Sequence, residues 1–404
     1  MNLDLGVNLA DPDAYAHGFP HDVFRRLRRE APVYWHEARH ERASKGFFVV
    51  SKYEDVKYVG RTPLIFSSAP GITLIDQGGD FEAGQSSMLQ MDPPLHARYR
   101  KLVSGGFTPR RINALEPMIR ELAGQILDEA AAKDKGRVDY VTDVAAELPL
   151  RVIARFLGVP DEDRALLFSA SNRLLGFEDT EYGTTEEDGR QGAMELAMLA
   201  HRIGEARKLA PKDDIVTILL NAEVDGDRLS DIDFIAFFVL LTVAGNETTR
   251  NQTSHTLRLL LEHPQELAKL QADPSLLPSA IEEALRFSPP VMYFRRTTTA
   301  DTELRGEHIA RGSYVAIYYP SANRDEDVFR DPDRFDITRS PNEHLAFGDG
   351  EHFCLGASLA RLQLRSIVGE TIRRFPKIAL DGEIALLRSH FIDGVKHMPV
   401  RLTA

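Results

Sequence analysis

The sequence is poor in features that would assign it to several classes of protein. It has a single cysteine, Cys354, which excludes an intramolecular disulfide and favours the cytoplasm. The first residues do not combine a basic stretch with an apolar one, so no signal peptide is expected. The longest strongly apolar run, residues 234–245, is too short to span a bilayer, so no membrane anchor is expected.

Linkers, low-complexity blocks and internal repeats are also lacking. At 43% hydrophobic residues the chain can form a large core, which favours one domain over residues 1–404. The net charge of −12 argues against a nucleic-acid partner, because such proteins need a basic face.

The clearest element is a long helix over residues 231–262. Ser230 and Asp233 form a capping box at its start, and His263 and Pro264 supply its end. At about 1.5 Å per residue it would be roughly 45–50 Å long. Its apolar segment, residues 234–245, is expected to be buried on every side.

The other patterns predict a mainly helical protein with small sheets. Further helices are expected over 113–132, 143–157, 187–209 and 278–287, one opening after Pro93-Pro94, and one from Cys354 to about 374. Short strands are expected over 47–50, 293–298 and 314–319, and near His390 and Val400. The β-containing part is thus placed mainly in 1–70, 290–320 and 380–404, and the helical part in 93–287 and 354–375.

The segment around the lone cysteine is rich in glycine and precedes a helix. Glycine permits positive φ and close backbone approach, which a flat macrocycle needs. A cysteine at a helix N-terminus is stabilised as a thiolate, and a thiolate on haem iron favours O–O cleavage. Two other interpretations of Cys354 remain: an inert buried side chain, or a nucleophile paired with His352.

The pattern Phe347-x-x-Gly350-x-His352-x-Cys354-x-Gly356 resembles the haem-binding signature of the cytochrome P450 family. The resemblance implies a cytochrome P450 fold, mainly α with small β-sheets, with haem b between the long central helix and the cysteine-loop helix. It also implies Cys354 as the axial iron ligand, and Phe347, Gly348 and Gly356 as cofactor-binding residues.

The run Ala244-Gly245-Asn246-Glu247-Thr248 resembles the oxygen-activation motif of the same family. Gly245 and the hydroxyl of Thr248 can weaken the helical hydrogen bonds and open a groove for dioxygen and water. Thr248 would then donate a hydrogen bond to the oxygen, and Glu247 would relay protons. Alternatively, Gly245 is a helix-packing contact and Thr248 bonds only its own backbone.

Two groups of charged residues match further family positions. Glu283 and Arg286, with Arg334 as third member, are expected to form a buried network of the scaffold, although a solvated i, i+3 pair is the alternative. His96, Arg100, Arg296 and His352 are expected to bind the haem propionates. Arg295 competes with Arg296, because alternation along a strand places only one of them on the inner face.

The resemblance also gives a substrate pocket that is almost entirely apolar, which predicts a hydrophobic substrate. Its expected lining residues are Ile72, Leu74, Ile75, Leu240, Ala244, Val291, Met292, Phe294, Phe391 and Ile392. The phrases VAGNETTRN and HFIDGVKHMPV look like the actinobacterial branch that acts on cholesterol side chains and methyl-branched lipids, and relatives of that branch take terpenes.

No flavin- or nicotinamide-binding module is recognisable, so a ferredoxin and its NAD(P)H-dependent reductase are the expected electron donors for O2 activation. An acidic ferredoxin needs a basic docking patch, for which Lys101, Arg110, Arg111, Arg361 and Arg365 are candidates. The alternatives are a haem-thiolate peroxygenase or isomerase, a non-catalytic haem or lipid carrier, and a cysteine hydrolase. The intact Glu247-Thr248 pair favours the monooxygenase over the first of these.

Overall fold

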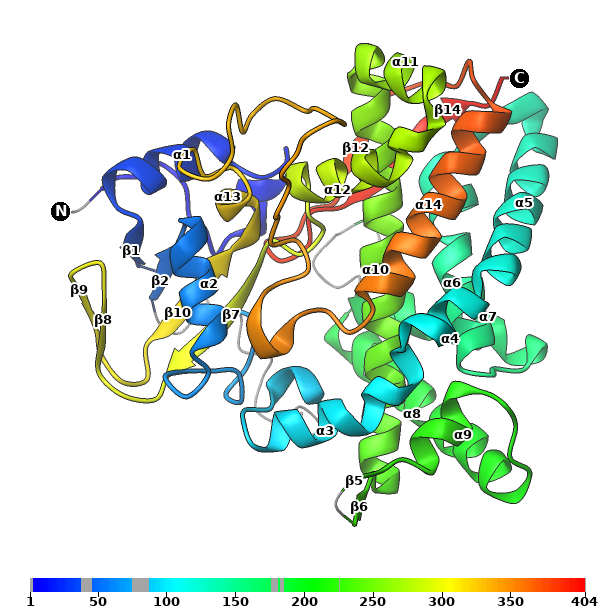
Figure 1. The fold of residues 1–404 in the computed structure, drawn as a ribbon, viewed down its shortest axis with the longest axis horizontal. Coiled ribbons are helices and arrows are strands. Elements are labelled where there is room, and N and C mark those ends of the chain that lie inside the picture. The colour runs from blue at the N-terminus through cyan, green and yellow to red at the C-terminus, as the bar shows by residue number, and fades with distance from the viewer. Residues whose placement is uncertain are drawn as a thin grey trace.

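The computed structural model describes residues 3–37, 46–74, 87–175, 181, 185–224 and 226–403. The predicted pocket residue Ile75 lies outside the described residues. Figure 1 shows a β-containing part that includes both early and late strands, beside a larger helical part. The segment that leads into α14 (Ala357–Arg374) passes between these two parts.

The largest sheet has five strands in the order β1-β2-β10-β7-β3. Strand β10 runs parallel to β2 and antiparallel to β7. All four residues of β2 are buried, as its unbroken apolar sequence predicts for a strand covered on both faces. These strands are β1 (Val33–His36), β2 (Phe47–Val50), β3 (Phe66–Ser67), β7 (Tyr293–Thr298) and β10 (Tyr314–Tyr318).

Smaller sheets pair distant parts of the chain, and β14 joins β11 to β4. The predicted C-terminal strands begin at Val395 and Pro399, so His390 precedes them. The remaining strands are β4 (Arg137–Asp139), β5 (Glu223–Val224), β6 (Asp227–Arg228), β8 (Thr302–Leu304), β9 (Glu307–Ile309), β11 (Ala379–Leu380), β12 (Ala385–Leu386), β13 (Val395–His397) and β14 (Pro399–Arg401).

Each predicted helical segment contains a helix, and the longest helix matches the predicted bounds at both ends, whereas α1, α2, α7, α9, α11 and α13 were not predicted. The helices are α1 (His21–Glu30), α2 (Tyr53–Arg61), α3 (Leu95–Ser104), α4 (Pro109–Ala114), α5 (Glu116–Ala132), α6 (Glu147–Phe156), α7 (Arg164–Leu175), α8 (Glu186–Leu209), α9 (Ile215–Leu220), α10 (Asp231–Glu262), α11 (Pro264–Ala272), α12 (Leu277–Phe287), α13 (Tyr319–Ala322) and α14.

Helix α10 runs through the helical part and packs against α8, α6, α14 and α12 (Figure 1). Its start is the predicted capping box, in which the Asp233 amide donates to Ser230 Oγ over 3.2 Å and the Ser230 amide donates to Asp233 Oδ2 over 3.1 Å. By length and composition α10 could cross a membrane, as the core helix of a globular protein also could. Its packing on four other helices is that of a core helix.

The burial of α10 differs from the expectation for its apolar segment. Residues 234–245 are not buried on every side: Leu240 is half-buried and Ala244 is exposed, although both lie in the middle of the helix. The polar residues that follow are the buried ones, from Asn246 to Thr256 with the exception of Thr248. Several of their hydroxyls donate to the carbonyl four residues earlier, as Thr253 does over 2.8 Å, which removes the cost of burying them.

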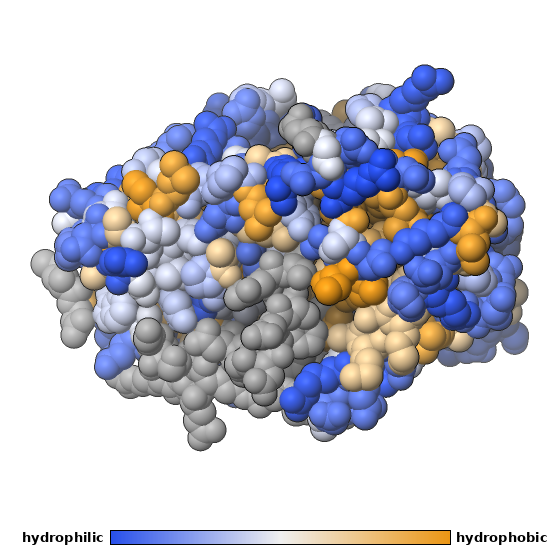
Figure 2. All heavy atoms as spheres, turned by 90° about the horizontal axis from the view of Figure 1, so that it is seen from below, coloured by the Kyte–Doolittle hydropathy of each residue, from blue (hydrophilic) through white to orange (hydrophobic). Residues whose placement is uncertain are grey.

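On the face seen from below in Figure 2, hydrophilic side chains predominate and apolar side chains gather in several patches among them. Exposed large apolar side chains include Met194 and Met198 on α8 and Ile232 at the start of α10.

Candidate functional site: the cysteine loop and the central helix

The backbone of the cysteine loop folds back on itself before α14 begins. The amide of Cys354 donates to the carbonyl of Phe347 over 2.9 Å. Gly348 and Gly350 have φ of 73° and 78°, and a Cβ on Gly350 would clash with the carbonyl of Gly60. Gly356 has φ of −86°, so its role is at the helix N-cap and not in a left-handed turn.

The environment of Cys354 acts on its thiol in two directions. Burial raises the pKa of the Cys354 thiol, and the amides of Gly356 and Ala357 and the guanidinium groups of Arg100 and Arg361 oppose that rise. The helix N-terminus therefore contributes as the sequence predicts, but burial is the larger effect in the ligand-free protein.

Four cationic or ionisable side chains gather beside the cysteine loop. His96 and Arg100 come from α3, Arg296 from β7, and His352 from the loop. The rings of His96 and His352 lie 4.1 Å apart between centroids. Helix α3, strand β7 and the cysteine loop thus bring together the four residues that the sequence predicts as propionate ligands.

The two guanidinium groups in this cluster form no ion pair among the residues that the structure describes. Burial lowers the pKa of Arg100 and of Arg296, and neither forms an ion pair with a carboxylate of the described residues. Burial and the neighbouring Arg100 lower the pKa of His96 to about 4. Burial and Arg296 lower the pKa of His352 to about 3. Glu351 acts electrostatically on both guanidinium groups, but from beyond ion-pair distance.

The donor set fits an anionic cofactor. His96 is 1% exposed, and neither of its ring nitrogens has a hydrogen-bond partner in the part of the chain that the structure describes. The Glu351 carboxylate lies 3.9 Å from His96 Nδ1, beyond hydrogen-bond distance. His96, Glu351 and His352 also have the composition of a metal site, but two adjacent guanidinium groups oppose a cation there. Carboxylates such as haem propionates suit these buried donors.

The structure separates the roles of Arg295 and Arg296. The Arg295 guanidinium donates to the carbonyls of Pro70 and Gly71 over 2.7 and 3.2 Å, and lies 4.0 Å from the centre of the Tyr314 ring. Arg296 points to the other face of the sheet, toward Tyr319 and Glu351. Arg296 is therefore the one that faces the cation cluster.

The helical motif on α10 has no break in the backbone. Thr248 donates to the Ala244 carbonyl over 2.6 Å, and a Cβ on Gly245 would lie 3.5 Å from Ile153. Both observations match the packing alternative for these two residues. Glu247 is buried and accepts hydrogen bonds from Arg250 and, over 2.8 Å, from Asn251. The sequence reasoning missed these two partners, although their i, i+3 and i, i+4 spacing would have indicated them.

The expected scaffold network contains a different third member. Glu283 and Arg286 are fully buried and 2.8 Å apart, and Arg339 lies 3.1 Å from the same carboxylate. The prediction of Arg334 is wrong: its side chain is 62% exposed and pairs with Asp336 over 3.8 Å. Only the Arg334 carbonyl takes part, as an acceptor from Arg286 and Arg339. Which arginine reaches Glu283 depends on the path of an irregular loop, for which the sequence has no periodic signal.

The predicted pocket residues divide into two groups. Phe391 and Ile392 lie beside Val291 and Phe294: Val291 and Ile392 form a β-bridge, and the rings of Phe294 and Phe391 are 5.8 Å apart. The carbonyl of Ile72 accepts a hydrogen bond from the backbone amide of Arg295, which follows Phe294 in β7.

Leu240 and Ala244 are on α10, and Leu240 packs against the same apolar cluster as Leu355 of the cysteine loop. The prediction that Leu74 and Met292 line the pocket is wrong. Each side chain is 1% exposed and packs in the hydrophobic core with Tyr293, so neither faces a pocket.

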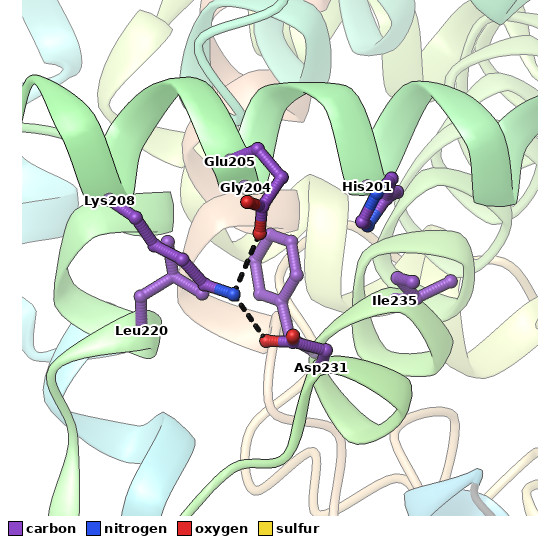
Figure 3. A pocket seen from close by; sticks show the side chains of 8 residues that line it. His201, Gly204, Glu205, Lys208, Leu220, Asp231 and Ile235 are labelled. Atoms are coloured by element: carbon purple, nitrogen blue, oxygen red, sulfur yellow. Dashed lines mark hydrogen bonds and ion pairs between the residues drawn. The ribbon is translucent and has the colours of Figure 1, made fainter.

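A shallow recess lies elsewhere, between α8 and the start of α10 (Figure 3). Its wall carries Lys208, which pairs with Glu205 over 2.8 Å and with Asp231 over 2.6 Å. These charged groups satisfy one another and apolar side chains complete the lining, so the recess is not part of the candidate site.

The fold and the site together define a mainly helical protein in which buried cations gather beside a lone cysteine, next to the N-terminus of α14. The cytochrome P450 family model matches residues 196–383. A steroid C26-monooxygenase of Rhodococcus jostii is 41% identical over 99% of this chain and 85% of its own length. A methyl-branched lipid omega-hydroxylase of Mycobacterium tuberculosis is 41% identical over 94% of this chain and 90% of its own length.

Among solved structures, a Mycobacterium marinum cytochrome P450 in complex with pseudoionone is similar, with a TM-score of 0.92 and 39% identity over 99% of this chain and 98% of its own. The chain belongs to the cytochrome P450 family. It is a P450 monooxygenase with the P450 fold, and its cofactor is haem.

Proposed function

We propose that the protein hydroxylates a hydrophobic small molecule, namely a sterol side chain, a branched lipid or a terpenoid, in the cytoplasm. The observation that carries this proposal is the buried cation cluster next to Cys354, whose guanidinium groups form no ion pair among the described residues. The apolar character of Phe294, Phe391 and Ile392 favours a hydrophobic substrate, and relatives named for steroid and methyl-branched lipid hydroxylation support the same class.

In this proposal Cys354 is the axial ligand of the haem iron. His96, Arg100, Arg296 and His352 bind the propionates, and Phe347, Gly348 and Gly356 shape the cysteine side of the cofactor site. Haem ligated by a thiolate supplies the activation of O2. The protein supplies the charge that fixes the cofactor and the dry environment in which it acts.

Glu247, Thr248, Gly245 and Ala244 form the proposed proton-delivery site on α10. Thr248 donates its hydroxyl hydrogen to the Ala244 carbonyl, so its oxygen is free to accept a hydrogen bond from water. To donate toward dioxygen, the hydroxyl has to rotate away from Ala244. Glu247 holds the proton-exchanging carboxylate, and Arg250 and Asn251 fix its position.

The first test is the absorption spectrum of the purified protein, reduced and then exposed to carbon monoxide. We expect the red-shifted Soret band of thiolate-ligated ferrous haem. The variant Cys354→His should lose that band, whereas His352→Gln, two residues away, should keep it. A colourless protein, or a wild-type band of the histidine-ligated kind, would contradict the proposal.

Electron delivery by a ferredoxin and an NAD(P)H-dependent reductase is tested on the basic patch. Lys101, Arg110, Arg111 and Arg365 are exposed. Arg361 is half-buried and pairs with Glu282 over 2.7 Å, so it is a poorer candidate than the sequence indicates. The double variant R110E/R365E should slow reduction by an acidic ferredoxin about tenfold or more and weaken its salt dependence. Arg330→Glu, at a site that is 95% exposed, serves as the control, and equal rates in both variants would exclude the patch.

A further inference from the structure

One face of α10 carries a row of buried polar side chains. Glu247, Asn251 and His255 follow one another at intervals of four residues, which places them one above the other on the helix. They are 5%, 1% and 0% exposed. The row faces the turn of residues 391–395, which carries the proposed pocket residues Phe391 and Ile392.

The side-chain amide of Asn251 connects the acid to this turn. Its nitrogen donates to Glu247 Oε1 over 2.8 Å, and its oxygen accepts from the amide of Val395 over 3.3 Å. A Cβ on Gly394 would lie 2.9 Å from the Asn251 oxygen, so a glycine allows the backbone to approach. One planar group is therefore bonded to both partners.

His255 fixes the same turn from the next position along the helix. Its Nδ1 lies 3.4 Å from Arg258 Nε, and arginine can only donate, so Nδ1 is the acceptor. Nε2 therefore carries the hydrogen and donates to the carbonyl of Asp393 over 3.0 Å. Burial lowers the pKa of His255, which agrees with a neutral ring.

The opposite side of the turn is bonded to the segment before β7. The carbonyl of Phe391 accepts from the amide of Met292 over 3.0 Å, and the amide of Asp393 donates to the carbonyl of Pro290 over 2.8 Å. The turn is thus held between the segment before β7 and α10, where the Asn251 amide is bonded.

We propose that Asn251 is a positioning residue that holds Glu247 and the turn of residues 391–395 in one arrangement, and so couples occupancy of the pocket to the orientation of the acid. The coupling rests on the proposed function, because that function gives Glu247 and the turn their roles. The geometry supports it, since a hydrogen bond weakens steeply with angle, so a shift of the turn disturbs both bonds of the amide.

Two variants separate the two bonds. Asn251→Ala removes both, whereas Asn251→Asp keeps an acceptor for Val395 and removes the donor to Glu247. With pseudoionone as the probe ligand, we expect Kd to rise about fivefold in N251A and to change less than twofold in N251D. The fraction of NAD(P)H electrons that reach product should fall about fivefold or more in both variants. A purely structural role would change both measurements in the same proportion.

Hydrogen exchange of the Val395 amide in the protein without substrate gives a readout that does not need turnover. We expect exchange to be about tenfold faster in N251A and near the wild-type rate in N251D. Ser254→Ala is the matched control, because Ser254 is fully buried on α10 and its hydroxyl donates to the carbonyl of Arg250 over 3.0 Å, with no bond to the turn among the described residues. This control should leave the exchange rate of the Val395 amide, the Kd for pseudoionone and the fraction of electrons that reach product unchanged.

Unchanged Val395 exchange in N251A, or wild-type coupling in N251D, would overturn the inference. If the wild-type protein neither binds haem nor turns over, the proposed function fails instead, and the exchange measurement still decides whether Asn251 holds the turn.

Discussion

Two groups of buried cations differ in how their charge is balanced. Arg286 and Arg339 share the carboxylate of Glu283, and Arg286 also donates to the carbonyls of Asn323 and Pro332 over 2.8 and 2.9 Å. Around the cysteine loop, Arg100 and Arg296 have no carboxylate partner among the residues that the structure describes. The ion pairs of the first group are complete within the chain, whereas the guanidinium groups of the second form none there and can bind a carboxylate that a ligand supplies.

This difference distinguishes a scaffold from a ligand site without reference to sequence motifs. Burying a charge without a partner is costly, so a chain retains such an arrangement where a ligand supplies the counter-charge. The histidines show the same contrast. His344 is bonded to Glu282 over 3.1 Å, whereas both ring nitrogens of His96 lack a described partner.

The largest effect is expected where the network is complete. Glu283→Gln leaves two buried guanidinium groups without a carboxylate and should lower the free energy of unfolding by about 3–5 kcal/mol. Urea denaturation measures this loss. Arg334→Gln is the control, and it should cost less than about 0.5 kcal/mol because that side chain is largely exposed. Similar losses of unfolding free energy in the two variants would contradict the assignment of Arg339, in place of Arg334, to the network of Glu283.

At the incomplete cluster the effect should appear in haem retention and not in folding. Arg296→Leu removes a buried cation without a carboxylate partner, so the haem-free protein should unfold within about 1 kcal/mol of the wild type. Haem dissociation, followed by transfer to a haem acceptor protein, should be about 10- to 100-fold faster.

The neighbouring substitution Arg295→Leu should give the opposite pattern. Its guanidinium is bonded to the carbonyls of Pro70 and Gly71, so the loss should appear mainly in stability. If haem dissociation responds more to Arg295 than to Arg296, the assignment of the two faces of β7 is wrong.

The smallest effect concerns pH. The pKa of His96 is lowered to about 4 in the folded ligand-free protein, against about 6.5 in the unfolded chain. Above pH 6.5 both states carry a neutral ring, and as the pH falls the unfolded chain binds the proton first. The haem-free protein should therefore lose about 2 kcal/mol of stability through His96 between pH 7 and 5.

His96→Gln should remove that part of the pH dependence in urea denaturation. In the haem-loaded protein the propionates favour the charged ring, so the dependence through His96 should be weaker than in the haem-free form. An equal dependence in both forms would argue against propionates at His96.

Local patterns predicted the elements well because they depend on near neighbours in the chain. The capping box at Ser230, the stop at His263 and the positive φ of Gly350 follow from residues only a few positions apart. The family pattern around Cys354 likewise lies within ten residues, from Phe347 to Gly356.

Other outcomes depended on residues far apart in sequence. The apolar run on α10 predicted complete burial, but only tertiary packing decided that Ala244 is exposed while Asn251 and His255 are buried against the turn of residues 391–395. Tertiary packing also decided that Arg339, and not the predicted Arg334, pairs with Glu283, and that Met292 is buried.

The sequence by itself thus determined the helices, the principal strands, the cysteine loop and the family, because local hydrogen bonding and spacing encode them. The tertiary structure alone decided which buried guanidinium groups form ion pairs inside the protein and which do not. The partners of a buried charge come from several elements, and no single segment of the chain contains them all.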